Sequence, residues 1–111
     1  MRILVTGAYG FIGSMVVEKL CAMGHDVTAM DNSETYGVIT AEDLKKLYKY
    51  RQRNWPHVYG SPGDVTKTLD VLKAFKPRPD YVIHLASYPR AKIVNADPMI
   101  GVQNVIGGTV N

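Results

Sequence analysis

The 111-residue sequence predicts an α/β fold, in which about four parallel strands alternate with helices in one domain over residues 1–111. Three observations carry this prediction. Short apolar runs alternate with segments of helical periodicity, the connections between them are short, and a glycine-rich turn follows the first run. Right-handed crossovers between parallel strands then give the order 3-2-1-4, which is an incomplete doubly wound sheet.

The first half of the chain is expected to supply two strands and two helices. Residues 2–6 and 27–30 are apolar and rich in β-branched residues, which is typical of buried strands. Residues 11–23 predict a helix that ends before Gly24. Thr40 is the expected N-cap of the next helix, with Asp43 in the place of a capping-box glutamate. The expected inward faces consist of Ile12, Val16, Val17, Leu20 and Cys21 in the first helix and of Leu44, Leu47, Tyr48 and Arg51 in the second.

The second half repeats this alternation with weaker signals. Residues 57–59 and 81–85 predict the third and fourth strands. The helix between them has two alternative caps, Asp64 and Thr66, and an expected buried face formed by Leu69, Leu72 and Phe75. Asp97 and Pro98 begin a last helix that has no stop signal before Asn111. The fourth strand would then form an uncovered apolar edge, which favours a fragment, a truncated product or a chain that needs a partner.

Composition excludes several classes of protein. Hydrophobic residues make up 46% and charged residues 21%, which are ordinary values for a globular domain. The net charge of +3 is too small to indicate nucleic-acid binding by itself, and the one cysteine, Cys21, excludes an internal disulfide. No apolar run approaches the roughly 18 residues that a membrane helix needs. With no signal-peptide pattern at the start, we expect a cytoplasmic protein without a membrane span.

The glycine-rich turn is the first functional signal. Gly7, Gly10 and Gly13 are spaced as G-x-x-G-x-x-G between a predicted strand and a predicted helix. Gly7 would allow the tight turn, Gly10 the approach of a pyrophosphate, and Gly13 the close packing of the helix. The helix N-terminus would present free N–H groups to the phosphates. The alternative is a tight turn with no ligand, but the flanking elements favour a Rossmann-type dinucleotide site.

Asp31 is the second functional signal. It lies at the end of the second predicted strand, 18 positions after Gly13, where an acidic residue is expected to bind the adenosine ribose hydroxyls. A carboxylate there would repel a 2′-phosphate, so the sequence predicts NAD rather than NADP as cofactor. The alternative is an ordinary surface aspartate in a turn.

Taken together, the motifs resemble the extended short-chain dehydrogenase/reductase family of NAD-dependent epimerases and dehydratases. The resemblance rests on residues 5–13, on Asp31-Asn32 and Gly63-Asp64-Val65, on residues 84–87, and on Asp97-Pro98 and Asn104. It implies that Asp64 accepts a hydrogen bond from the adenine amino group, that Val65 contacts the ring, and that residues 85–87 line the nicotinamide. The cofactor contacts expected in all are Gly7, Tyr9, Gly10, Phe11, Ile12, Gly13, Asp31, Asn32, Asp64, Val65, Leu85, Ala86 and Ser87.

The chain departs from the family pattern near its end. The family has a second small residue where Ser87 stands, and a Gly-Thr pair where Gly107-Gly108 precedes Thr109. The catalytic Tyr-x-x-x-Lys of the family belongs to a fifth strand and helix that this sequence does not reach. One such string occurs earlier, Tyr88 to Lys92, but Pro89 disfavours helix at Tyr88 and the string follows the wrong strand. We expect a loop there, with Arg90 or Lys92 available to an anion, and no catalytic residue in the chain.

The resemblance implies the NAD-binding portion of an enzyme for nucleotide sugars, inactive alone and dependent on a missing carboxy-terminal half or partner chain. One alternative is a non-catalytic nucleotide-sensing or interaction module of natural short length. A second is a nucleic-acid binder that uses basic residues 45–53, but the apolar spacing of that helix favours a solvated face. The histidines, His25, His57 and His84, show no metal-ligand spacing, so no metal site is expected.

Overall fold

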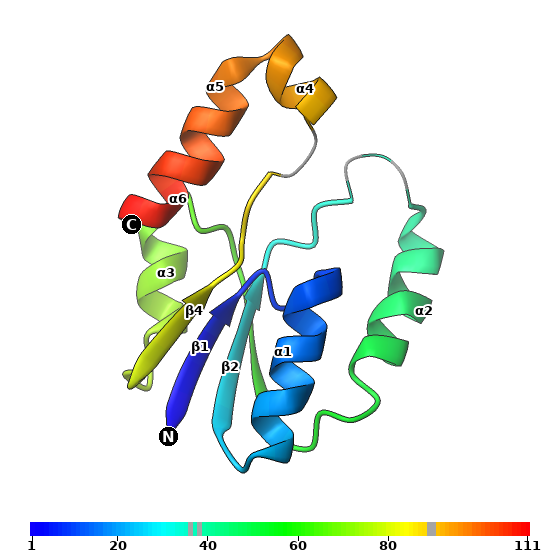
Figure 1. Ribbon diagram of the computed structural model, residues 1–111, viewed down its shortest axis with the longest axis vertical. Coiled ribbons are helices and arrows are strands. Elements are labelled where there is room, and N and C mark those ends of the chain that lie inside the picture. Colours follow the sequence, from blue (N-terminus) through cyan, green and yellow to red (C-terminus); the bar gives the residue numbers. More distant parts are fainter. Residues whose placement is uncertain (36, 38, 89–90) are drawn as a thin grey trace.

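The fold is a four-stranded, wholly parallel sheet with helices on both faces (Figure 1). The computed structural model describes residues 1–35, 37, 39–88 and 91–111, with the backbone alone at 91 and 92. The strands are β1 (Arg2–Thr6), β2 (Asp26–Asp31), β3 (Val58–Pro62) and β4 (Tyr81–His84). Their order, β3-β2-β1-β4, confirms the predicted topology.

The helices follow the strands in alternation. They are α1 (Phe11–Ala22), α2 (Ala41–Arg51), α3 (Thr68–Ala74), α4 (Ala91–Ala96), α5 (Pro98–Gly101) and α6 (Gly108–Val110), with a π-helical turn, η1 (Val102–Gly107), between the last two. Among the described residues, no helix is long and apolar enough to cross a membrane. The described residues also hold no cluster of histidine, cysteine, aspartate or glutamate side chains suited to a metal.

Alternate residues of β1 build two separate cores, one on each face of the sheet. Ile3 and Val5 pack with Val17 of α1, whereas Leu4 packs on the opposite face with Met30 and Ala74. Such burial of both faces explains why the strand is a continuous apolar run rather than an alternating one.

Helix α1 ends as the sequence predicts. Gly24 has a φ of +84°, and its N–H donates to the carbonyl of Cys21 while the N–H of His25 donates to that of Leu20. These two bonds form a Schellman motif, for which glycine is the favoured residue. Burial raises the pKa of the Cys21 thiol, as expected of a structural cysteine.

The expected inward face of α1 is correct except at Ile12. Val17 is buried, and Val16, Leu20 and Cys21 are partly buried against the same core. Ile12 is 64% exposed, because it lies in the first turn of the helix, beyond the end of the strand that the helix covers. Its side chain instead lines a cavity described below.

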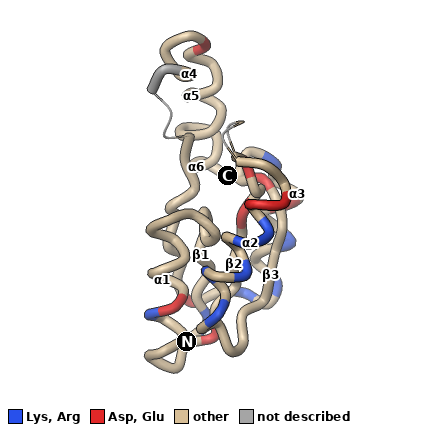
Figure 2. The backbone as a smooth tube through the Cα atoms, turned by 90° about the vertical axis from the view of Figure 1, so that its right-hand side faces the viewer, with Lys and Arg blue, Asp and Glu red and all other residues tan. Residues whose placement is uncertain are grey.

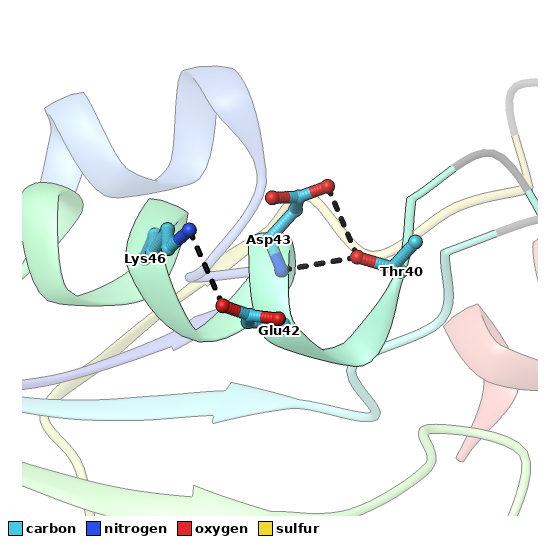
Figure 3. Close-up of polar contacts among 4 residues, drawn as sticks. All are labelled: Thr40, Glu42, Asp43 and Lys46. Carbon is cyan, nitrogen blue, oxygen red and sulfur yellow. Dashed lines mark hydrogen bonds and ion pairs between the residues drawn. The ribbon is translucent and has the colours of Figure 1, made fainter.

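Helix α2 begins at the predicted cap (Figure 3). The hydroxyl of Thr40 accepts a hydrogen bond from the N–H of Asp43 at 3.2 Å and donates to the Asp43 carboxylate at 3.0 Å. Glu42 and Lys46 form an exposed ion pair at 3.4 Å one turn further on. Such exposed pairs contribute little, so the cap is the main local determinant of where this helix starts.

The buried face expected for α3 is wrong. Leu69, Leu72 and Phe75 are 72%, 54% and 38% exposed, whereas Ala74 is 1% exposed and packs inward beside Val71. The three large residues do share one side of the helix, but the helix turns its smaller residues toward the sheet. Periodicity identifies residues on a common face and does not show which face the sheet covers.

Neither alternative cap precedes α3 directly. The N-cap is Lys67, and one carboxylate oxygen of Asp64 accepts from both the N–H and the hydroxyl of Thr66, at 2.8 and 2.7 Å. Asp64 and Thr66 therefore stabilise each other in the turn before the helix. This local side chain-to-backbone bonding competes with capping.

The strand ends and the C-terminal segment differ in detail from expectation. Strand β3 extends to Pro62, because parallel pairing with β2 uses main-chain groups that a pattern of side chains does not reveal.

Helix α4 is not predicted by the sequence, because it is too short to show periodicity. Tyr88 lies before it and outside any helix, as Pro89 predicts, whereas Pro89, Arg90 and the side chain of Lys92 fall outside the described residues. Asp97 caps α5 as expected.

Candidate functional site

A cavity of about 630 Å³ opens at the carboxyl ends of the strands. All of the predicted cofactor contacts line it except Asp64. The structure therefore brings together three segments that are far apart in the sequence: the glycine-rich turn, the end of β2 and the loop after β4. The other lining residues are Met30, Glu34, Thr35, Ile39, Leu44, Leu47, Tyr48, Arg51, Gly63 and Asn104.

Two glycines of the turn are required by the fold itself. Gly7 has a φ of +68°, and a Cβ on it would lie 2.8 Å from main-chain atoms of Leu85 and Ala86. A Cβ on Gly13 would lie 2.0 Å from the carbonyl oxygen of Gly7. The turn, helix α1 and the loop after β4 are therefore packed at main-chain contact.

Gly10 plays a different part, since a Cβ there would come no nearer than 3.1 Å to any neighbouring atom. It is the N-cap of α1, has extended backbone with a φ of −66°, and gives the helix no side-chain cap. The first turn also carries no acidic residue. The helix thus presents its N-terminal N–H groups and partial positive charge to the cavity.

The carboxylate of Asp31 is oriented by two main-chain N–H groups. One oxygen accepts from Tyr9 at 3.0 Å and the other from Ser33 at 2.8 Å. Ser33 adopts a φ of 60°, which is unusual for a residue other than glycine. A carboxylate has about four acceptor positions, so each oxygen retains capacity to bind a hydroxyl in the cavity.

Two further segments complete the wall. The N–H groups of Leu85 and Ala86 both donate to the hydroxyl of Thr6 at 3.2 Å, which holds the loop after β4 against β1. Val65 lines the cavity, whereas Asp64 lies outside its wall and bonds to Thr66. The main-chain N–H of Asp64 donates to the carboxylate of Asp70 at 3.0 Å, so α3 positions this turn.

Helix α2 supplies site residues that sequence reasoning assigned to an apolar face. The guanidinium of Arg51 donates a hydrogen bond to the carbonyl of Tyr9. The Tyr9 ring lies between Tyr48 and Trp55, at centroid distances of 4.6 and 5.1 Å, and its hydroxyl accepts from Gln52 at 2.6 Å. No sequence signal links positions 9 and 51, because these contacts depend on how α2 packs beside the turn.

The pKa of the Tyr48 hydroxyl reflects the charged and polar groups around it in the cavity wall. Its pKa is raised, first by burial and then by the nearby Asp31 carboxylate, whereas a hydrogen bond with Ser33 and the charge of Arg51 act in the opposite direction. Asp31, Ser33, Tyr48 and Arg51 are thus close enough to interact electrostatically. Asn104 lies elsewhere in the wall, where its side-chain amide donates to the carbonyl of Ile100 at 2.9 Å.

Three of the five basic residues between positions 45 and 53 have partners within the chain. Figure 2 colours charged residues of both signs along α2, which carries Glu42 and Asp43 in its first turn and Lys49 and Arg51 in its last. Lys46 pairs with Glu42, Arg53 stacks on the ring of Tyr50 at 3.8 Å, and Arg51 binds Tyr9. This arrangement favours the solvated face that the apolar spacing predicts.

Comparison with known proteins agrees with this geometry. The model of the NAD dependent epimerase/dehydratase family matches residues 3–111. UDP-glucuronic acid decarboxylase 1 of Danio rerio is 30% identical over 110 residues, which are 99% of this chain and 23% of that protein. UDP-glucose 4-epimerase of Mycolicibacterium smegmatis is 34% identical over 96% of this chain and 32% of its own length.

Solved structures give the same result. The Thermus thermophilus UDP-glucose 4-epimerase in complex with NAD has a TM-score of 0.75 and 32% identity, over 99% of this chain and 32% of that one. The Bifidobacterium longum UDP-glucose 4-epimerase with NAD⁺ and UDP has a TM-score of 0.78 and 28% identity, over 99% and 31%. The chain thus spans about a quarter to a third of the relatives it matches. By the family match over nearly all of its length, this chain belongs to the NAD-dependent epimerase/dehydratase family.

Proposed function

We propose that this chain binds NAD in the cavity at the carboxyl ends of its strands, as the NAD-binding portion of an enzyme that acts on a nucleotide sugar. The observation that carries the proposal is the joint placement of two groups in one cavity wall. The uncapped N-terminus of α1 and the oriented carboxylate of Asp31 both face it. A volume of about 630 Å³ falls within the range for cofactor-sized ligands.

The diphosphate is proposed to rest against the turn from Gly10 to Gly13. The N–H groups of the first helical turn and the helix dipole favour an anion there. The absence of a Cβ at Gly10 leaves its main chain open to the ligand. Phe11 and Ile12, which are 74% and 64% exposed, would lose exposed apolar surface when the ligand covers them.

The adenosine is proposed to lie beside β2. Asp31 would accept hydrogen bonds from the ribose hydroxyls, and its negative charge would disfavour the 2′-phosphate of NADP. Asn32 would contact the same sugar. Val65 in the cavity wall would contact the adenine ring, and Asp64 in the adjoining turn would accept from the adenine amino group, as the resemblance implies.

The nicotinamide is proposed to lie beside residues 85–87. When bound, this group would accept or donate hydride for the whole enzyme. Leu85, Ala86 and Ser87 would hold the ring and exclude water from it. We propose that the chain alone is inactive toward a nucleotide sugar, because the family's catalytic Tyr-x-x-x-Lys is not present at the required position. We also propose a cytoplasmic location.

Titration calorimetry with NAD, NADP and ADP-ribose tests this proposal. We expect the 111-residue chain to bind NAD and ADP-ribose with similar affinity, since the contacts are concentrated on the adenosine and diphosphate, and to bind NADP at least about tenfold more weakly. Asp31→Ala should lower NAD affinity and reduce the discrimination against NADP. If the chain binds none of the three nucleotides, the proposal is overturned, and a non-catalytic interaction module is favoured instead.

A further inference from the structure

The main chain of Tyr9 joins two charged side chains from different elements. Its N–H donates to the carboxylate of Asp31 at the end of β2, and its carbonyl accepts from the guanidinium of Arg51 at the end of α2. All three residues line the cavity. Tyr9 therefore connects a cation and an anion that form no direct ion pair among the described residues.

The bonds of Arg51 fix one particular peptide group. The carbonyl of Tyr9 and the N–H of Gly10 belong to the same plane, and this N–H donates to the carbonyl of Gly7 at 3.1 Å. The Tyr9–Gly10 peptide plane is thus held through its carbonyl by Arg51 and through its N–H by Gly7, and it has little freedom to rotate. The preceding plane carries the N–H that orients Asp31 and meets this plane at the Tyr9 Cα, so a displacement of that Cα would move the donor too.

The side chain of Tyr9 is anchored separately. Its ring packs against Tyr48 and Trp55, and its hydroxyl accepts from Gln52. Loss of the Arg51 guanidinium would thus leave the ring in place and release the carbonyl. This separation makes it possible to test orientation of the turn without removing the packing of α2.

We propose that Arg51 is a positioning residue of the dinucleotide site, which holds the Tyr9 carbonyl so that the Tyr9 N–H keeps Asp31 oriented toward the ribose. The proposal rests on the proposed NAD-binding function. It assigns to α2 a role in cofactor affinity that its helical pattern does not indicate. Arg51 acts through Tyr9, and its effect on the ligand therefore depends on the presence of the Asp31 carboxylate.

A double-mutant cycle tests this dependence. Arg51→Met removes the donors and keeps most of the aliphatic stem, and Asp31→Asn removes the charge. We expect Arg51→Met to weaken NAD binding by about 3- to 10-fold, the range of one hydrogen bond, and to have less than about a twofold effect in the Asp31→Asn background. Arg51→Lys, which retains a donor, should restore part of the affinity.

Arg53→Met is the matched control. Arg53 lies just beyond the same helix, stacks on Tyr50 and does not line the cavity, so its replacement should leave NAD affinity unchanged. An equal effect of Arg51→Met with and without the Asp31 carboxylate would overturn the proposal, because a general loss of stability or a direct contact with NAD would produce that result.

The Tyr9 amide provides a readout that needs no ligand. Its proton resonance in the free chain should move when Asp31→Asn removes the carboxylate that accepts from this N–H. The size of that change should shrink in the Arg51→Met background and persist in the Arg53→Met background. An equal change of the Tyr9 amide resonance on Asp31→Asn, with and without the Arg51 guanidinium, would contradict the positioning role. The wild-type chain could bind no NAD while the Tyr9 amide resonance still depends on both Arg51 and Asp31. In that case the proposed cofactor function fails, and the positioning of Asp31 by Arg51 through Tyr9 stands.

Discussion

The hydroxyl of Thr6 lies 2.6 Å from Nδ1 of His84, across the paired carboxyl ends of β1 and β4. The same hydroxyl accepts from the N–H groups of Leu85 and Ala86, so its own proton is the one directed at His84. Nε2 of His84 then faces the hydroxyl of Thr109 at 3.2 Å. One chain of hydrogen bonds thus ties β1, the cavity loop and the last helix together.

Removing the Thr6 hydroxyl should loosen this loop. Thr6→Val conserves shape and leaves the Ala86 N–H and one ring nitrogen of His84 without their partner, whereas the Leu85 N–H keeps the Thr6 carbonyl. This loss should destabilise the chain by about 1–3 kcal/mol. Urea denaturation measures the change. Thr28→Val is the control, since no hydrogen bond of the Thr28 side chain is found within the described ranges, and it should be near neutral. Equal stability of the two variants would contradict the assigned role of Thr6.

The glycines at positions 13 and 10 should separate folding from binding. A Cβ at Gly13 would lie 2.0 Å from the Gly7 carbonyl oxygen, whereas one at Gly10 would lie 3.1 Å from it. Gly13→Ala should therefore destabilise the chain by about 3 kcal/mol or more. Gly10→Ala should keep a melting temperature close to that of the wild type and lose about tenfold or more in NAD affinity.

Calorimetry and thermal melts on the same two proteins check this pair. Full NAD binding by Gly10→Ala would show that the ligand does not approach the main chain there. A wild-type melting temperature for Gly13→Ala would show that the turn and helix are not packed as described.

Tyr48 should contribute a pH-dependent part of the stability. Its pKa is raised above the ordinary value of 10.0, mainly by burial. Because the pKa is raised by folding, the unfolded chain loses the Tyr48 proton at a lower pH than the folded chain does. The contribution of Tyr48 to the free energy of unfolding is therefore complete below about pH 10 and declines as the pH rises through the folded pKa. The difference in unfolding free energy between wild type and Tyr48→Phe should stay constant below about pH 10 and narrow as the pH rises above it. A difference that stays constant above about pH 10 would contradict the prediction.

Some features of the site were predictable because their cause is local. The positive φ of Gly7 and Gly24, the cap at Thr40 and the placement of Asp31 at a strand end all follow from short sequence patterns. Parallel strands with short crossovers then place the glycine-rich turn and Asp31 at the same edge of the sheet. The topology and most of the cavity wall could be predicted for this reason.

Other features depend on packing between distant elements. The bond from Arg51 to the Tyr9 carbonyl spans 42 positions of the sequence and requires the observed placement of α2. The face of α3 was wrong because Ala74 rather than Leu72 meets the sheet, a choice that periodicity leaves open. Both cases are tertiary contacts that override or extend a local pattern.

The most direct test of the NAD site is a nitrogen–proton correlation spectrum of the labelled chain, recorded during titration with NAD. The proposed contacts predict the largest shifts at residues 10–13, at Asp31 and Asn32, and at residues 85–87, with smaller changes along the outer edge of the sheet. NAD-dependent shifts confined to other surfaces, or no shifts at millimolar NAD, would contradict the placement of the dinucleotide in this cavity.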